Sequence, residues 1–183
     1  MVEAPLTPEQ LKGLVRTVPD WPVDRVQFRD ITTLLSDPAG LRSTVHHLVH
    51  MARQTGASQI AGMEARGFIF GAAVAVELGA GFIPVRKPGK LPVETIGIDY
   101  ALEYGGDRLE LAPGAIRRDE KVLIIDDLIA TGGTALAAAQ LLRQAGATVT
   151  KAVFVIDLPE LGGAAKLREA EIEVEALMEF DGE

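Results

Sequence analysis

The sequence predicts an α/β domain in which helices flank a central parallel sheet. Helical and strand patterns alternate along the chain, as expected when parallel strands are joined by crossover helices. The four consecutive aliphatic residues at 122–125 are typical of a central strand that is covered on both faces. The 183 residues are 48% hydrophobic and 24% charged, which suits one globular domain with a substantial core.

The first half of the chain is predicted to hold three helices and two sheet strands, separated by glycine-bearing turns. Thr7 is the expected N-cap of the first helix, and Ser36 or Asp37 that of the second. The helices are expected at Pro8 to Val18, about Pro38 to Gln54 and Gly67 to Leu78, the strands at Ser58 to Ala61 and Gly81 to Val85, and an extended segment at Val26 to Ile31.

The second half begins with a segment rich in proline and glycine, from Lys87 to Gly114. Alternating apolar and aromatic residues within it predict a hairpin with a long mobile arm. After the strand at 122–125 we expect a helix from Thr134 to Gln144, stopped by Gly146. Another interior strand (152–156) and a helix (162–170) follow, and the acidic tail (171–183) is expected on the surface.

Composition excludes several classes of function. The net charge of -8 opposes binding to nucleic acid, whose affinity for proteins comes mainly from lysine and arginine. The chain has no cysteine, which removes disulfides and thiolate chemistry and fits a reducing compartment. The longest uncharged apolar stretch, Gly67 to Val76, is far below the roughly 20 residues of a membrane span. With no signal-like N-terminus, we expect a cytoplasmic protein.

Two aspartates and a glycine-containing loop follow the 122–125 strand. Asp126 and Asp127 come first, and the loop runs from Ala130 to Thr134. Backbone N–H groups of such a loop can encircle a phosphate, because Gly132 and Gly133 allow left-handed dihedrals and close approach. The helix dipole and the hydroxyls of Thr131 and Thr134 add to this.

The acid pair requires a different role, since carboxylates repel phosphate. They can accept hydrogen bonds from vicinal ribose hydroxyls or hold Mg²⁺ through water. A phosphorylated sugar satisfies both demands. The alternative is that a turn merely joins strand to helix while the aspartates cap it.

The run from Val122 to Thr134, VLIIDDLIATGGT, resembles the 5-phosphoribosyl 1-pyrophosphate (PRPP) signature of type I phosphoribosyltransferases. Three more segments, Val26 to Leu35, Ala61 to Gly71 and Pro84 to Gly105, are similar to the adenine phosphoribosyltransferase family in particular. The likeness extends from about Val18 to Leu158. One departure is Asp24-Arg25, which stands where that family usually has Pro-Gly.

The resemblance implies the type I phosphoribosyltransferase fold as a single domain over residues 1–183. A small hood that includes the adenine-pocket segment would lie in residues 1–36, and a flexible catalytic arm in residues 87–112. The implied reaction is adenine + PRPP to AMP + pyrophosphate, a step of purine salvage. The implied cofactor is Mg²⁺, held by the substrate without a direct protein ligand, or through water to Asp126 and Asp127. A homodimer is also implied.

The same resemblance assigns the site residues. The catalytic groups would be Glu103, as acid/base beside the purine and supported by Tyr104, with Arg66 and Asp127. The PRPP-binding residues would be Asp126, Asp127, Ala130, Thr131, Gly132, Gly133, Thr134, Arg66, Arg86, Lys87 and Lys90. The adenine-binding residues would be Val26, Gln27, Phe28, Arg29 and Leu158. Phe28 would stack on the base, while main-chain groups around Gln27 and Arg29 would read its edge.

Two other functions remain open at this stage. One is transfer to another base, namely hypoxanthine, guanine, xanthine or orotate. The other is a noncatalytic PRPP-sensing regulator, which should carry a basic DNA-binding extension or lack the arm. Outside the site, we expect Trp21 to be a core or interface anchor, and His46 and His50 to have surface or packing roles.

Overall fold

A computed structural model of the protein describes residues 4–102 and 105–182. Its centre is a five-stranded parallel sheet with the order β4-β3-β7-β8-β9. The strands span Gly81–Val85 (β4), Gln59–Met63 (β3), Val122–Ile129 (β7), Lys151–Asp157 (β8) and Glu173–Glu179 (β9). From β3 the chain first adds β4 on one side and later adds β7 on the other. The direction of winding therefore reverses between β3 and β7.

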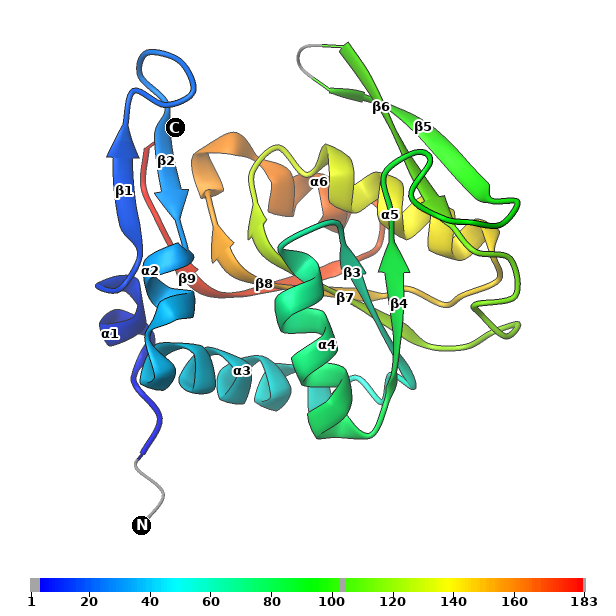
Figure 1. Cartoon of the computed structure of the whole chain (residues 1–183), viewed down its shortest axis with the longest axis horizontal. Coiled ribbons are helices and arrows are strands. Elements are labelled where there is room, and N and C mark those ends of the chain that lie inside the picture. The colour runs from blue at the N-terminus through cyan, green and yellow to red at the C-terminus, as the bar shows by residue number, and fades with distance from the viewer. Residues whose placement is uncertain (1–3, 103–104, 183) are drawn as a thin grey trace.

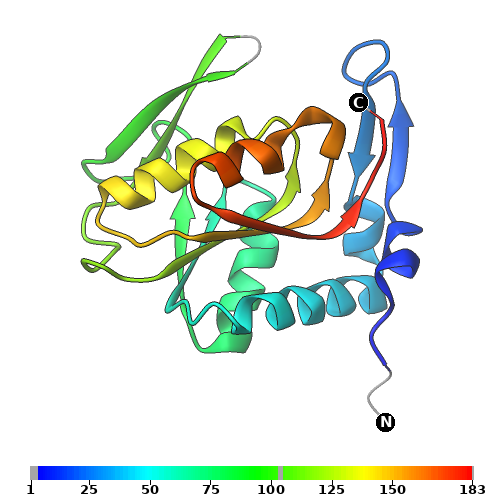
Figure 2. The same cartoon turned by 180° about the vertical axis from the view of Figure 1, so that it is seen from behind.

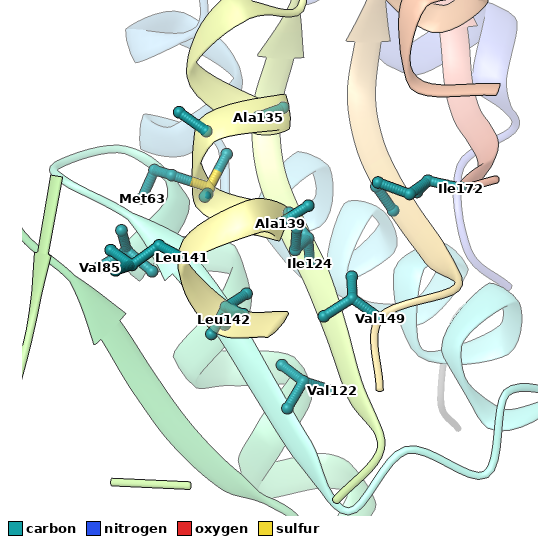
Figure 3. Packing of buried hydrophobic residues seen from close by; sticks show 14 of the residues in the cluster. Met63, Val85, Val122, Ile124, Ala135, Ala139, Leu141, Leu142, Val149 and Ile172 are labelled. Atoms are coloured by element: carbon teal, nitrogen blue, oxygen red, sulfur yellow. The ribbon is translucent and has the colours of Figure 1, made fainter. Parts of the chain in front are cut away.

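Helices cover both faces of this sheet, as predicted. The helices α3 (Pro38–Arg53) and α4 (Gly67–Leu78) lie on one face, and α5 (Gly133–Gln144) and α6 (Gly163–Glu169) lie on the other (Figures 1 and 2). A short 3-10 helix, Pro159–Leu161, precedes α6. Figure 3 shows Ala135 and Ala139 of α5 above Ile124 of β7. Small alanine side chains on this face of α5 let the helix approach the sheet closely.

Most predicted elements agree with the structure within a few residues. The α4 helix and the β4 strand have the predicted bounds, and Asp37 caps α3 by accepting the Gly40 N–H at 2.6 Å. The β7 strand continues four residues beyond the predicted end, so both aspartates lie within it. Among residues 4–102 and 105–182, no helix is long and apolar enough to cross a membrane.

The N-terminal region forms a small hood rather than one long helix. The α1 helix spans only Pro8–Lys12, with Thr7 capping it as predicted. The predicted continuation to Val18 is wrong, because Arg16–Pro19 (β1) pairs antiparallel with Gln27–Asp30 (β2). Long-range strand pairing has here overridden the local helical pattern. A short helix, α2 (Thr32–Ser36), then leads into α3.

The predicted hairpin is confirmed as β5 (Ile96–Leu102) and β6 (Gly105–Leu111). Leu109 and Leu111 at its base are fully buried. The hood and the hairpin rise at opposite ends of the same edge of the sheet (Figures 1 and 2). They flank the edge at which the strands have their carboxyl ends.

The acidic tail is not a surface appendage, which corrects the prediction. Residues Glu173–Glu179 form β9, the edge strand parallel to β8. Leu177, Met178 and Phe180 are buried against the α3 side of the sheet. The acidic residues hid a partly alternating strand pattern, since the glutamates at 173 and 179 are exposed.

Candidate active site

A cavity of about 470 Å³ opens at the carboxyl ends of β3 and β7. This is the point where the winding of the sheet reverses, and open α/β sheets bind ligands there because the neighbouring loops diverge. The structure gathers into it all the predicted PRPP residues except Arg86 and Lys90. The lining residues are Met63, Glu64, Ala65, Arg66, Lys87, Asp126, Asp127, Leu128, Ile129, Ala130, Thr131, Gly132, Gly133, Thr134 and Ala135.

The predicted phosphate loop, residues 130–134, has the backbone shape that its glycines predict. Gly132 adopts a left-handed conformation (φ 75°) as the N-cap of α5, and Gly133 is the first residue of that helix. The loop rests on the start of α6, where the Gly163 N–H donates to the Ala130 carbonyl at 3.0 Å. A Cβ atom at position 163 would lie 2.2 Å from the Ala130 carbonyl oxygen. The loop therefore depends on a glycine about 30 residues away in the sequence.

The acid pair lies at the floor of the cavity. Asp127 is only 4% exposed, and its backbone N–H donates to Asp126 Oδ1 at 2.9 Å. Burial, and then the neighbouring Asp127 charge, raise the pKa of Asp126 well above its usual range. Burial also raises the pKa of Asp127, although the Arg66 guanidinium opposes this rise. Two desolvated carboxylates that face a cavity are typical of a binding site rather than of a stable core.

Arg66 and the short loop before α4 form the wall opposite the phosphate loop. The Arg66 Nε lies 2.6 Å from Asp127 Oδ2, and the Arg66 side chain stays 47% exposed. Close glycine packing fixes this wall. A Cβ on Gly67 would lie 2.6 Å from Asp126 Oδ1, and one on Gly62 would lie 2.6 Å from the Gly67 carbonyl oxygen.

The three predicted basic residues occupy different positions. Lys87 lines the cavity. Arg86 instead donates from Nε to Glu64 Oε2 at 3.0 Å, and Lys90 is exposed outside the cavity. The Lys87 backbone N–H, and then Arg86, lower the pKa of Glu64. Glu64 therefore stays ionised at neutral pH and offsets the charge of Arg86, leaving Lys87 and Arg66 as the cations at the cavity.

The predicted adenine segment adjoins this cavity without lining it. The Phe28 ring lies with its centroid 5.9 Å from the Arg66 guanidinium carbon. The Phe28 ring also contacts the Trp21 ring edge to face, with 4.6 Å between the two centroids. Val26 and Gln27 are half-buried, and Leu158 is buried after β8, where its N–H donates to the Ile129 carbonyl at 3.1 Å. The hood, the loop before α4 and the loop at 130–134 therefore lie close to one another.

The Arg29 side chain points to the C-terminal segment. It donates to Thr17 Oγ1 and to the Asp181 carbonyl, each at 2.6 Å. Its guanidinium carbon also lies 4.7 Å from the centre of the Phe180 ring. The side chain therefore anchors the hood to the end of β9, which leaves only the backbone of Arg29 available to a base.

The turn that differs from the family pattern keeps a glycine-like geometry. Arg25 has a φ of 73°, in the region that glycine prefers and that costs other residues about 1 kcal/mol or more. The Arg25 N–H donates to Asp20 Oδ1 at 2.8 Å, which holds the turn. Arg25 therefore takes up a conformation that glycine adopts readily, at the position where the family usually has glycine.

Three predictions away from the cavity have separate outcomes. Glu103 and Tyr104 lie outside the described residues, so their roles stay predictions. Trp21 is 52% exposed, so it is not a core anchor of this chain. His46 and His50 are exposed on α3, in agreement with the expected surface role, and His47 between them bonds to the Leu6 carbonyl at 2.8 Å.

Comparison with known proteins decides the family. Residues 47–170 match the family model described as a phosphoribosyl transferase domain. The curated adenine phosphoribosyltransferases of Erythrobacter litoralis and Novosphingobium aromaticivorans are each 68% identical over 177 residues, covering 97% of this chain and 99% of theirs. The chain belongs to the adenine phosphoribosyltransferase family.

Solved structures of the family agree with this fold. The adenine phosphoribosyltransferase of Thermoanaerobacter pseudethanolicus superposes with a TM-score of 0.91 at 41% identity, over 95% of this chain and 100% of that one. The Giardia lamblia enzyme, solved with 9-deazaadenine, gives 0.90 at 30% identity over 96% and 98%. These values confirm the predicted type I phosphoribosyltransferase fold.

Sequence reasoning missed several residues around the site. Gly163 supports the 130–134 loop, yet its only sequence signal is the Gly-Gly pair at the start of a predicted helix. Tyr100 belongs to the alternating pattern that predicts the hairpin, and Asp107 follows the glycine pair of the same segment. Both contact Lys87, and no local pattern links positions that far apart.

Proposed function

We propose that the chain transfers the 5-phosphoribosyl group of PRPP to adenine, forming AMP and pyrophosphate. The observation that carries the proposal is the cavity at the winding reversal of the sheet, which joins a phosphate loop, a buried acid pair and Arg66. The relatives with 68% identity named adenine phosphoribosyltransferase support the choice of base. So does the yeast structure, at 36% identity, which was solved with adenine and an imino-altritol bisphosphate.

Each wall of the cavity suits one part of PRPP. The N–H groups from Ala130 to Thr134 and the start of α5 suit the 5-phosphate, because they present donors and the positive end of a helix dipole. Asp126 and Asp127 can accept hydrogen bonds from the two ribose hydroxyls. Arg66 and Lys87 suit the pyrophosphate, and binding would draw Arg66 away from Asp127. Arg86 and Lys90 lie outside the cavity, so they could contact the pyrophosphate only if residues 86–90 move.

The reaction exchanges one bond at C1 of the ribose for another. The C1–oxygen bond to pyrophosphate breaks with its electron pair leaving on the oxygen, and the N9 atom of adenine bonds to C1 and loses its proton. By resemblance, Glu103 would accept that proton. Positive charge that develops at C1 is stabilised by fixed carboxylates, and the departing charge by Arg66 and Lys87. The residues that line the cavity therefore act by positioning and electrostatics.

Mg²⁺ fits the donor set of this cavity. In proteins Mg²⁺ keeps several waters and binds one or two carboxylates together with substrate phosphates, and Asp126 and Asp127 offer two carboxylates beside the expected pyrophosphate. Residues 4–102 and 105–182 contain no cluster of three or more histidine, aspartate or glutamate side chains that could hold a metal alone. When bound, the ion would neutralise charge on the pyrophosphate oxygens. We therefore propose that it enters with PRPP.

We also propose a homodimer in the cytoplasm. Val76 and Ile69 of α4 are 80% and 41% exposed, and they belong to the helix that follows directly from the Arg66 loop. Light scattering coupled to size-exclusion chromatography tests the dimer. Val76→Glu should shift the protein toward the monomer, and a monomeric unaltered protein would overturn the proposal.

The activity test is incubation with PRPP and Mg²⁺ and one base at a time, followed by detection of the nucleotide. We expect AMP from adenine and no nucleotide from hypoxanthine, guanine, xanthine or orotate. Asp127→Asn serves as the inactive control. Nucleotide from another base alone would reassign the specificity. No product with any base, despite PRPP binding, would favour a PRPP-sensing regulator.

A further inference from the structure

A network of four polar side chains stands behind the cavity and connects the arm to the phosphate loop. The Lys87 ammonium forms an ion pair with Asp107 and donates to the Tyr100 hydroxyl at 3.2 Å. The Tyr100 hydroxyl in turn donates to Asp107 Oδ2 at 3.0 Å. It also lies 3.3 Å from Thr134 Oγ1. The first residue of the 87–112 arm, the hairpin of that arm and the start of α5 are therefore joined at one point.

Two side chains of this network line the cavity, and the other two lie behind them. Lys87 and Thr134 line the cavity, whereas Tyr100 and Asp107 are absent from its lining. Both belong to the paired strands of the arm, where they lie opposite each other in register. Tyr100 and Asp107 consequently touch the groups that face the substrate, but they do not face it themselves.

The electrostatics explain what such an arrangement does. Burial lowers the pKa of Lys87, but Asp107 and Tyr100 outweigh this effect and raise it. The bond from Lys87 is the main cause that lowers the pKa of Asp107. Both groups are therefore charged at neutral pH. A carboxylate so close to the expected pyrophosphate would repel the substrate if it acted alone, so its role is best understood through the lysine that it holds.

We propose that Asp107 and Tyr100 are positioning residues that hold the Lys87 ammonium at the cavity before PRPP binds. A lysine side chain loses considerable rotamer freedom when it is fixed on a ligand. Here the arm fixes it beforehand, so less freedom is lost on binding. The contact between Tyr100 and Thr134 ties the same pair to the phosphate loop, which keeps Lys87 in register with the other end of PRPP. This role rests on the proposed function.

The test compares Asp107→Asn and Tyr100→Phe with the unaltered protein. Both replacements keep the size of the side chain, so the arm should remain folded. We expect the Kd and the KM for PRPP to rise about 3- to 10-fold, the effect of leaving one long side chain unordered before binding. The KM for adenine should change less than 2-fold, and a general loss of structure would not produce that split.

Two further variants make the test specific. Asp99→Asn is the matched control, because Asp99 pairs with Arg108 at 3.1 Å in the same hairpin but is 81% exposed; it should leave the PRPP constants unchanged. In a Lys87→Met background, Asp107→Asn should not weaken PRPP binding further and should instead relieve the repulsion from the unpaired carboxylate, because a residue that acts through Lys87 needs Lys87. Equal effects of Asp107→Asn with and without Lys87 would overturn the proposal.

Calorimetric titration of the protein with PRPP, in the presence of Mg²⁺ and the absence of adenine, separates this role from the catalytic activity. Weaker binding by Asp107→Asn would support the role whether or not AMP is formed. Unchanged binding by both Asp107→Asn and Tyr100→Phe would overturn it and leave the proposed function standing. Failure of the unaltered protein to bind PRPP would overturn both.

Discussion

Asp126→Asn is expected to make the ligand-free protein more stable at neutral pH. Asp126 and Asp127 are adjacent in β7, where Asp127 is buried and Asp126 is half-buried beside the cavity; burial together with the Asp127 charge raises the pKa of Asp126 well above its usual range. Asparagine keeps the oxygen that accepts the Asp127 N–H at 2.9 Å. It also offers an amide that can donate to Asp127, so the substitution removes one charge without removing a bond.

The magnitude follows from the repulsion that is removed. Two unit charges ~4 Å apart repel by about 4 kcal/mol at an effective dielectric constant of about 20. Attraction to Arg66 offsets part of this, so we expect a net gain of about 1–2 kcal/mol. For a chain of this length, 1 kcal/mol shifts the melting temperature by about 2–4 °C. The variant should therefore melt about 2–8 °C higher at pH 7.5.

The pH dependence gives the sharper check. An acid whose pKa is raised on folding binds more protons in the folded than in the unfolded state, so stability falls as pH rises from its ordinary value of 3.8 through the folded value. The Asp126→Asn variant has no carboxyl group to titrate at this position, so it does not lose this stability as the pH rises. Its advantage in melting temperature should consequently grow between pH 5 and pH 8.

Asp30→Asn serves as a control, because it should lower the stability of the folded protein where Asp126→Asn should raise it. The Thr32 N–H, and then Arg16, lower the pKa of Asp30 to about 2. The stability that Asp30 contributes is present above its unfolded pKa and is lost only as pH falls toward 2. Asp30→Asn should therefore be less stable than the unaltered protein throughout pH 5–8. The reasoning would be refuted if Asp126→Asn were the less stable protein at pH 8, or if its advantage were the same at pH 5.

Three further substitutions probe the site. Arg66→Ala should lower turnover by roughly 100-fold or more while the protein stays folded; because the buried Asp127 loses its cation, its pKa should rise further and the melting temperature should fall more at pH 8 than at pH 5, and turnover like that of the unaltered protein would contradict this. Gly163→Ala should weaken PRPP binding at least about 10-fold and cost about 1–3 kcal/mol, since its Cβ would overlap the Ala130 carbonyl; calorimetry and thermal melting measure the two effects. Arg29→Leu should raise the KM for adenine about 10-fold, the effect of losing charge-assisted bonds that hold the hood, with an unchanged KM for PRPP; an unchanged KM for adenine would contradict the anchoring role.

Local patterns predicted the elements whose formation depends on local forces. Thr7 and Asp37 cap helices as expected, and the 122–125 run lies in the central strand. The patterns failed at residues 16–19 and 173–179, which are strands only because distant partners pair with them. An isolated strand has no internal hydrogen bonds, so its state depends on what lies beside it.

For the site, the sequence by itself determined which groups are available: a glycine-containing loop at 130–134 that suits a phosphate, an acid pair before it, and basic residues near 66 and 87. Only the tertiary structure decided how these groups are used. It assigned Arg86 to Glu64 and the Arg29 side chain to the C-terminal segment, and it placed Asp107 behind Lys87. The reason is physical: a charged side chain reaches only a few ångströms, so its partner depends on which distant segments the sheet brings together.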